Sequence, residues 1–419
     1  RFQDAARLVR FLFGSQPGHA ASLWNPLKNE IDLKNELVQF FYQGAVVSAT
    51  RQGQKPITRG KTIMKTVAGG FRRMMLVGTA ALALAPAGAW AQEELNALVW
   101  CDHTDPALIE PFEKEHNVKV NLKEYAGTGA AISIIEQSRP GDWDVLVIDA
   151  VDVPRAIDMD ILGEMPADKL PLSDLFPELR MEETTTKDGK IYAVTEKFGY
   201  NTIAFDKSKV DPADMEDISV MWSEKYKGRI ALYDYYLPMV AFAGIAIGKQ
   251  TATLTESDLP AIKEKLFEMK KVARQVSDVV AAQTALTTGE VDIVVGGGEF
   301  LTAGLTAEKP NLDWTIPKQG ALLWAQSIGV FKDSEKQDLA LKFVQYIVSP
   351  EGQARLATSS CYWAMPANAK AGEHLTEQQK AALRWDHQPA YLKNTQLYPV
   401  VDSDMDAAMQ DVWTEMMQQ

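Results

Sequence analysis

The sequence predicts an α/β protein with two lobes, each built on a sheet of mostly parallel strands. Short apolar runs alternate with helical patterns in the order strand, helix, strand, helix, strand. This order is typical of a parallel sheet with helices on both faces. The pattern restarts after Gly228, and the chain of 419 residues is longer than one hydrophobic core usually fills. Two lobes are therefore expected.

The first lobe begins with five predicted elements. They are a strand at 95–100, a helix at 106–116, a strand at 118–122, a helix at 130–138 and a strand at 145–148. The first helix carries Leu108 and Phe112 on one face, four residues apart. The second helix is predicted to end at the Arg139-Pro140-Gly141 turn.

The second lobe is predicted from two buried strands at 230–233 and 291–295. The helix between them is recognised by apolar residues at i, i+3, i+7 and i+10, namely Leu259, Ile262, Leu266 and Met269. Further helices are expected at 336–348 and 406–417. The last helix has one stripe of large side chains, which we interpret as core rather than a cofactor site: Met409, Val412, Trp413 and Met416.

An export signal is predicted at residues 64–91. Lys65, Arg72 and Arg73 are basic, 74–87 is apolar, and Ala89-Trp90-Ala91 matches a small-x-small cleavage site. The apolar stretch is shorter than a membrane-spanning helix needs, so we expect cleavage before Gln92 and a periplasmic location. The paired arginines resemble a twin-arginine signal, but the general secretory route is favoured. Because Met64 is the first methionine, residues 1–63 are expected to be upstream sequence outside the fold.

Composition narrows the possible partners. The formal net charge is −13, and the segment before Gln92 is basic, so the remainder is more acidic still. Such a surface repels phosphate backbones and favours cationic ligands, which makes nucleic acid an unexpected partner. Cys101 and Cys361 are the only cysteines. In an oxidising compartment they are expected to form a disulfide, the alternative being two buried thiols.

No motif indicates catalysis or a cofactor. Metal-type Cys/His clusters, G-x-S-x-G, the Walker A pattern and a strand-to-helix G-x-G-x-x-G are absent from the sequence. The run GGGEF at 296–300 looks like the signature loop of diguanylate cyclases, but the acidic metal-binding segment of that family is missing. We therefore expect no enzyme, no metal and no cofactor.

Several segments resemble the periplasmic spermidine/putrescine-binding proteins in order and spacing. The first are LVWCDH at 98–103, PALIEPFEKE at 106–115 and DWDVLV at 142–147. The later ones are Phe198-Gly199, WSEKYKG at 222–228, GEVD at 289–292, PKQG at 317–320 and Trp324. The resemblance covers nearly all of the chain after the export signal.

This resemblance implies a type II periplasmic-binding fold, in which two α/β lobes close on a ligand at the carboxyl ends of their strands. It divides the chain into lobe one at 92–199 and 325–368, and lobe two at 200–324 and 369–419. It also implies a monomer that delivers a polyamine or related small amine to the membrane permease of an ABC importer.

The resemblance also implies the ligand-binding residues. An ammonium group needs aromatic faces and carboxylates when it leaves water. Trp100, Asp102 and Trp324 match an aromatic, an acid and a second aromatic of the family, and Tyr362 or Trp363 falls where a further aromatic is expected. The complete expected set is Trp100, Asp102, His103, Asp152, Asp234, Tyr235, Glu299, Trp324, Gln326, Tyr362 and Trp363.

Some positions depart from the family pattern. Gln326 replaces an acid, Tyr235 aligns with another acid, and Gly297 replaces an aromatic. Losing a carboxylate removes an anchor for a distal amine, so a shorter amine or an amino acid is expected to fit better than spermidine. One alternative is an iron(III)-binding relative, because His103, Asp234, Tyr235 and Tyr236 are hard-metal ligands. A carboxylate-binding relative of the same fold is another.

Overall fold

The computed structural model describes residues 92–125, 127–398 and 403–419. The predicted export signal at 64–91 and the segment 1–63 lie outside the described residues. No helix in the described part of the chain is long and apolar enough to cross a membrane.

The first half of the described chain forms the predicted strand-helix repeat. Strand β1 pairs in parallel with both β2 and β3. Helix α4 starts where predicted, because Asp105 caps it by accepting the backbone N–H of Ala107 at 2.8 Å and Pro106 fixes its first turn. The elements are β1 (Glu93–Val99), α4 (Pro106–His116), β2 (Val118–Glu124), α5 (Thr128–Gln137), β3 (Val145–Asp149), α6 (Val153–Asp158), α7 (Glu182–Thr185), β4 (Thr186–Lys187) and β5 (Lys190–Ile191).

A second set of parallel strands follows. Strand β7 pairs in parallel with β8 and β9. The predicted strand at 230–233 matches β7, whereas the next predicted strand is shifted to 293–297 and β8 was not predicted. The elements are β7 (Ile230–Tyr233), α8 (Tyr236–Ala246), α9 (Leu259–Val272), β8 (Ala273–Ser277), α10 (Val279–Thr288), β9 (Ile293–Gly297), α11 (Glu299–Thr302) and β10 (Leu312–Thr315).

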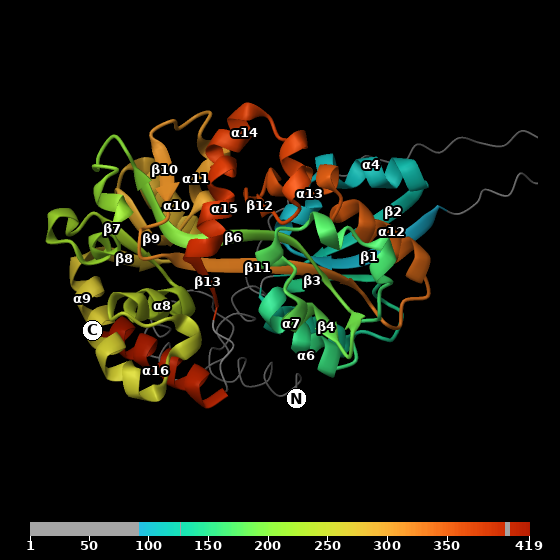
Figure 1. Ribbon diagram of the computed structural model, residues 1–419, viewed down its shortest axis with the longest axis horizontal. Helices are drawn as coiled ribbons and strands as arrows, with labels where there is room; N and C mark the ends of the chain where they lie inside the picture. Colours follow the sequence, from blue (N-terminus) through green and yellow to red (C-terminus); the bar gives the residue numbers. More distant parts are fainter. Residues whose placement is uncertain (1–91, 126, 399–402) are drawn as a thin grey trace, which may run out of the picture. The chain divides into compact units, whose positions relative to one another are not determined.

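Two long strands, β6 (Val194–Asp206) and β11 (Ala321–Val330), join the two sets (Figure 1). The strand order is β2-β1-β3-β11-β6-β9-β7-β8. The first half of β6 pairs with β11, and its second half pairs with β9 and β10. All positions of β6 are buried, so this strand lies at the centre of both halves of the sheet. The exact residues that divide the lobes stay a prediction.

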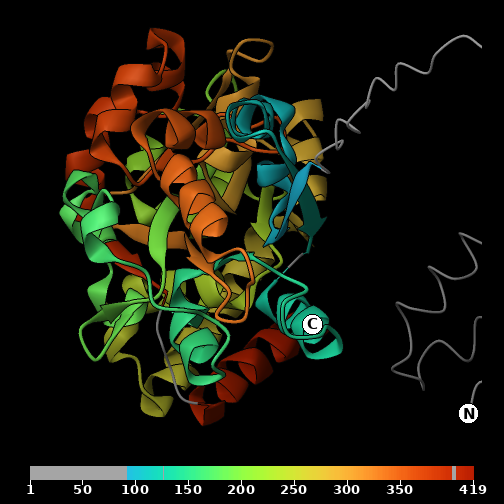
Figure 2. The ribbon, with the colours of Figure 1, turned by 90° about the vertical axis from the view of Figure 1, so that its right-hand side faces the viewer.

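Helices cover both faces of the sheet. Figures 1 and 2 show α14 and α15 on one side of the crossing strands and α16 on the other. The predicted stripe of α16 is buried with residues of α8 and α9, which confirms its role as core. The remaining elements are α12 (Gln337–Ile347), α13 (Pro350–Ala357), β12 (Met365–Pro366), α14 (Glu377–Ala382), α15 (Gln388–Tyr391), β13 (Thr395–Leu397) and α16 (Ser403–Gln418).

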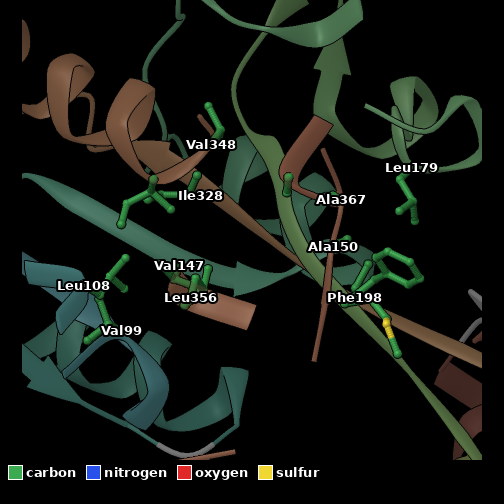
Figure 3. Packing of buried hydrophobic residues seen from close by; sticks show 14 of the residues in the cluster. Val99, Leu108, Val147, Ala150, Leu179, Phe198, Ile328, Val348, Leu356 and Ala367 are labelled. Carbon is green, nitrogen blue, oxygen red and sulfur yellow. The ribbon is translucent and has the colours of Figure 1, made fainter. Parts of the chain in front are cut away.

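One hydrophobic cluster is continuous across the two sets of strands. It contains Leu108 of α4, Val147 of β3, Phe198 of β6 and Leu356 of α13 (Figure 3). The same cluster reaches Leu286 of α10 in the other half of the sheet. The opposite face carries two separate clusters, one under α8, α9 and α16 and the other under α5 and α6. The hydrophobic core is thus continuous on one face of the sheet and split into two clusters on the other.

A disulfide ties the end of β1 to the segment after α13. Cys101 and Cys361 are bonded, and their Cα atoms lie 6.0 Å apart, within the range a disulfide allows. Beside the bridge, Asp105 accepts the backbone N–H of Ser360 at 2.7 Å. The bridge therefore holds the neighbours of the two cysteines, Asp102 and Tyr362, in one region.

Gly199 lies in β6 where two large side chains cross the strand. A Cβ atom at this position would overlap with Oε1 of Glu299 and with the ring of Trp324. Both side chains can therefore pack against β6 only because residue 199 is glycine.

We predict that the double variant Cys101→Ser/Cys361→Ser is less stable than the wild type. The bridge closes a sequence separation of 260 residues, and removing a native disulfide typically costs about 2–5 kcal/mol. Chemical denaturation of the variant and of the wild type, with and without reductant, measures the effect. Equal midpoints for the variant and the oxidised wild type would contradict this role.

We also predict that Gly199→Ala destabilises the protein by about 1–3 kcal/mol, because the added methyl group overpacks the contact with Glu299 and Trp324. Gly129→Ala is the matched control, since a Cβ there meets nothing within 4 Å and the residue lies in α5. The control should be neutral or slightly stabilising. Denaturation midpoints of the two variants compare the sites, and equal midpoints would show that Gly199 is not crowded.

Candidate functional site

Three strands present one row of polar side chains at the centre of the sheet. Gln326 of β11 lies directly opposite Asp149 of β3 and also opposite Lys197 of β6. Directly opposed residues of antiparallel strands point to the same face. The side chains of Asp149, Gln326 and Lys197 therefore form a single polar row across three strands.

Lys197 lies inside a cage of aromatic and acidic groups. Its side chain is 1% exposed and forms an ion pair with Asp102, which is fully buried. Its Nζ donates a hydrogen bond to Tyr362 Oη at 2.8 Å and lies 4.3 Å from the centre of the Tyr362 ring and 5.8 Å from that of Trp324. Burial lowers the pKa of Lys197, and the charge of Glu299 opposes this shift. The cage has the composition expected for an ammonium ligand.

His103 extends this cluster to a second carboxylate. Its Nδ1 lies 3.2 Å from Asp102 Oδ1, and its Nε2 lies 3.0 Å from Glu196 Oε1. The register of β6 against β11 shifts at this point, leaving Glu196 as an extra residue beside Lys197. Such a bulge re-aims a side chain. Glu196 and Lys197, although adjacent in the strand, can thus both join the cluster.

Asp149 lies at the end of β3, and it forms no ion pair with a lysine or arginine in the part of the chain that the structure describes. Burial, and secondarily the charge of Asp152, raises its pKa to about 7, and a hydrogen bond from Gln326 opposes the rise. Among the described residues, no lysine or arginine contributes to its pKa. Burial is the main reason why the pKa values of Tyr125 and Tyr235 are raised, and the charge of Asp149 is the second. Both phenols therefore lie close enough to Asp149 to feel its charge.

A narrow cavity adjoins Asp149. Met181, Trp324 and Tyr398 are among its lining residues, together with Asp149 itself. Its volume of about 10 Å³ has room for roughly one water. Because Trp324 faces both this cavity and the Lys197 cage, the two sites share one aromatic wall.

Glu299 closes the cage from the start of α11. Its fully buried carboxyl group accepts the backbone N–H of Tyr200 at 3.1 Å. Burial raises the pKa of Glu299 to about 8, against the opposing effect of backbone hydrogen bonds and of Lys197.

The structure brings together most of the expected ligand-binding residues. Trp100 packs against Tyr125 with ring centres 5.3 Å apart, and Asp152 lies close enough to Asp149 to affect its pKa. Trp363 instead packs against the large hydrophobic cluster. The remaining members at the cage or its polar row are Asp102, His103, Glu299, Trp324, Gln326 and Tyr362.

Three other expected residues of the second lobe, Asp234, Tyr235 and Tyr236, lie outside the cage, although Tyr235 lies close enough to Asp149 to feel its charge. Asp234 accepts a hydrogen bond from Trp413 at 3.3 Å, and Tyr236 donates one to Asp406, so both contact α16. The ring of Tyr235 packs against Tyr398, 5.9 Å between centres. His103 is held by Asp102 and Glu196 instead. The four residues proposed above as iron ligands do not converge.

Neither a metal-binding cluster nor the larger hollow of the described chain coincides with the cage. The described part of the chain contains no group of three or more His, Cys, Asp or Glu side chains arranged to hold a metal ion. A larger hollow of about 540 Å³ lies between β10 and α14 and contains none of the expected residues. Its Arg384 is paired with Asp313 at 2.8 Å.

Sequence reasoning missed Asp149, Glu196 and Lys197. Two signals were present in the sequence. Glu196 and Lys197 are charged residues inside a long strand pattern, and Asp149 ends the apolar run VLVID. Charged residues are almost never fully buried unless they are paired, so the two in β6 indicated a polar cluster.

A family profile and individual known proteins similar to this chain all indicate bacterial solute-binding proteins. The profile of the bacterial extracellular solute-binding proteins matches residues 107–383. A putrescine/agmatine-binding protein of Pseudomonas aeruginosa is 26% identical over 312 residues, covering 70% of this chain and 84% of the relative. A spermidine/putrescine-binding periplasmic protein of Escherichia coli is 22% identical over 294 residues, covering 70% and 83%.

A solved structure confirms the fold. The spermidine/putrescine ABC transporter substrate-binding protein of Streptococcus pneumoniae superposes with a TM-score of 0.66 at 18% identity, covering 78% of this chain and 99% of the other. This likeness confirms the predicted type II periplasmic-binding fold of two α/β lobes. Since the family profile spans most of the chain, the protein belongs to the bacterial extracellular solute-binding proteins.

Proposed function

We propose that this protein is the solute-binding subunit of an ABC importer and captures a polyamine or related small amine. The observation that carries the proposal is Asp149, a carboxylate that lines a cavity among aromatic rings and has no cationic partner in the described part of the chain. Two relatives of this protein support the proposal by their names. The one from Pseudomonas aeruginosa is named for binding putrescine and agmatine, and the one from Escherichia coli for binding spermidine and putrescine.

The chemistry of this cavity suits an ammonium group. Asp149 can accept a charge-assisted hydrogen bond from the ligand nitrogen, and such bonds are about twice as strong as neutral ones. Trp324 and Tyr398 provide aromatic faces beside the same cavity. Each cation–π contact contributes about 0.5–2 kcal/mol. The bound cation would also favour the ionised form of Asp149, whose pKa is otherwise raised.

The size of the cavity implies an opening motion. A space for roughly one water cannot admit an amine, so the lobes must separate before the ligand enters. Closure around the ligand would then present a distinct form to the permease, as ligand-driven population shifts require. We propose that the protein acts as a periplasmic monomer.

We predict that Asp149→Asn weakens amine binding by about tenfold or more, because it replaces a charge-assisted hydrogen bond with a weaker neutral one. Asp158→Asn is the control, since Asp158 is an exposed partner of Lys187. Isothermal titration with butylamine and putrescine measures both variants. Unchanged affinity in Asp149→Asn would overturn the proposed site.

A pH series gives an independent prediction. The pKa of Asp149 is raised to about 7 in the fold, above its unfolded value of about 4, so this group lowers the stability of the free protein as pH rises between these values. Amine binding should reverse the trend and release a fraction of a proton near pH 7. Melting temperatures of the wild type and Asp149→Asn from pH 5 to 8 test the sign. A wild type whose stability relative to Asp149→Asn rises with pH would contradict it.

A further inference from the structure

We propose that Lys197 supplies the chain's own ammonium group to a second amine subsite, so that the cleft takes a ligand with one cationic group and an uncharged or anionic far end. This inference rests on the proposed function and narrows its ligand class. It predicts that a monoamine is preferred to a diamine of the same length.

The surroundings of Lys197 Nζ are those that a free ammonium ligand would need. A carboxylate from Asp102, a phenol oxygen from Tyr362 and the rings of Tyr362 and Trp324 all contact it or lie within 6 Å. These groups come from separate segments: η3 (Cys101–Thr104), β11 and the turn after the disulfide. A binding site built around an amine is therefore filled from within the chain.

The ion pair removes the attraction for a second ligand cation. As an ion pair, Asp102 and Lys197 carry no net charge, and Glu299, the other carboxyl group that closes the cage, already accepts the backbone N–H of Tyr200. An ammonium group brought to this place would displace Lys197 or remain unpaired in a buried site, and both are unfavourable. Asp149, which lines the cavity and forms no ion pair with a lysine or arginine among the described residues, can instead pair with a ligand cation.

The two subsites are close enough for one ligand to sense both. Asp149 and Lys197 lie on either side of Gln326 in the same row of the sheet. Two strand spacings separate them, about 10 Å between backbones. Trp324 borders both places. A ligand anchored at Asp149 would point its far end toward the cage of Lys197, where a second ammonium group is disfavoured.

The test uses four amines that each have four carbon atoms and differ at the far end: putrescine, 4-aminobutanol, butylamine and 4-aminobutanoate. Isothermal titration of the wild type should give tighter binding of 4-aminobutanol than of putrescine, by about tenfold or more. Lys197→Ala frees Asp102 and opens the cage, so the ratio should shift toward putrescine by at least tenfold. Putrescine should also raise the melting temperature of this variant more than 4-aminobutanol does.

Two control variants distinguish the effect of the freed Asp102 charge on the ligand ratio from the effect of the space that Lys197→Ala opens. Asp102→Asn/Lys197→Ala has the same space without the acid and should gain no preference for putrescine. Lys336→Ala removes the lysine 3.2 Å from the buried Asp144, outside the cleft, and should lower stability without changing the ligand ratio. If Lys197→Ala folds only with an amine present, its refolding yield with putrescine against 4-aminobutanol gives the same comparison.

The outcomes distinguish the two proposals. Wild type that binds 4-aminobutanol, with an unchanged ratio in Lys197→Ala, overturns the role of Lys197 and leaves the proposed function standing. If the wild type prefers putrescine, the role of Lys197 is also wrong, but the proposed function still stands. If none of the four compounds binds the wild type or the variant, the proposed function and this inference are both wrong.

Discussion

The structure depends on β6, a strand that is buried at all its positions and shared by both halves of the sheet. A buried strand must satisfy its backbone on both edges. The first half of β6 pairs with β11 and, at Lys197 and Phe198, with β12, and its second half pairs with β9 and β10. It must also satisfy its charged side chains. The cluster around Lys197 is how the fold meets this second requirement.

Charge compensation explains the arrangement of that cluster. An unpaired buried charge is strongly destabilising, whereas a paired one is tolerated when its remaining hydrogen bonds are made. Lys197 is met by Asp102 and Tyr362, and His103 lies between Asp102 and Glu196. Asp149 stands outside this balance. Burial, and secondarily the charge of Asp152, raises its pKa, and no lysine or arginine of the described residues opposes this shift.

Patterns of local periodicity predicted the elements well. Helix 106–116 and strand 230–233 were predicted with the bounds they have, because capping residues and short apolar runs act locally. The family resemblance placed Asp102, Trp324 and Tyr362 near one another. It could not show that Lys197 lies between them, since this depends on a register shift in β6 and on pairing across distant strands. Asp234 and Tyr236 of the second lobe instead contact α16, where Asp234 accepts a hydrogen bond from Trp413 and Tyr236 donates one to Asp406.

The disulfide between Cys101 and Cys361 has a consequence for when the cage becomes rigid. Each cysteine is followed directly by a cage residue, Asp102 or Tyr362. Disulfides form in oxidising compartments and stay open where thiols are kept reduced. A newly made chain in a reducing compartment thus lacks the covalent tie between these two walls. Oxidation then acts as a maturation step, coupling the preorganisation of the cage to the compartment in which the chain folds.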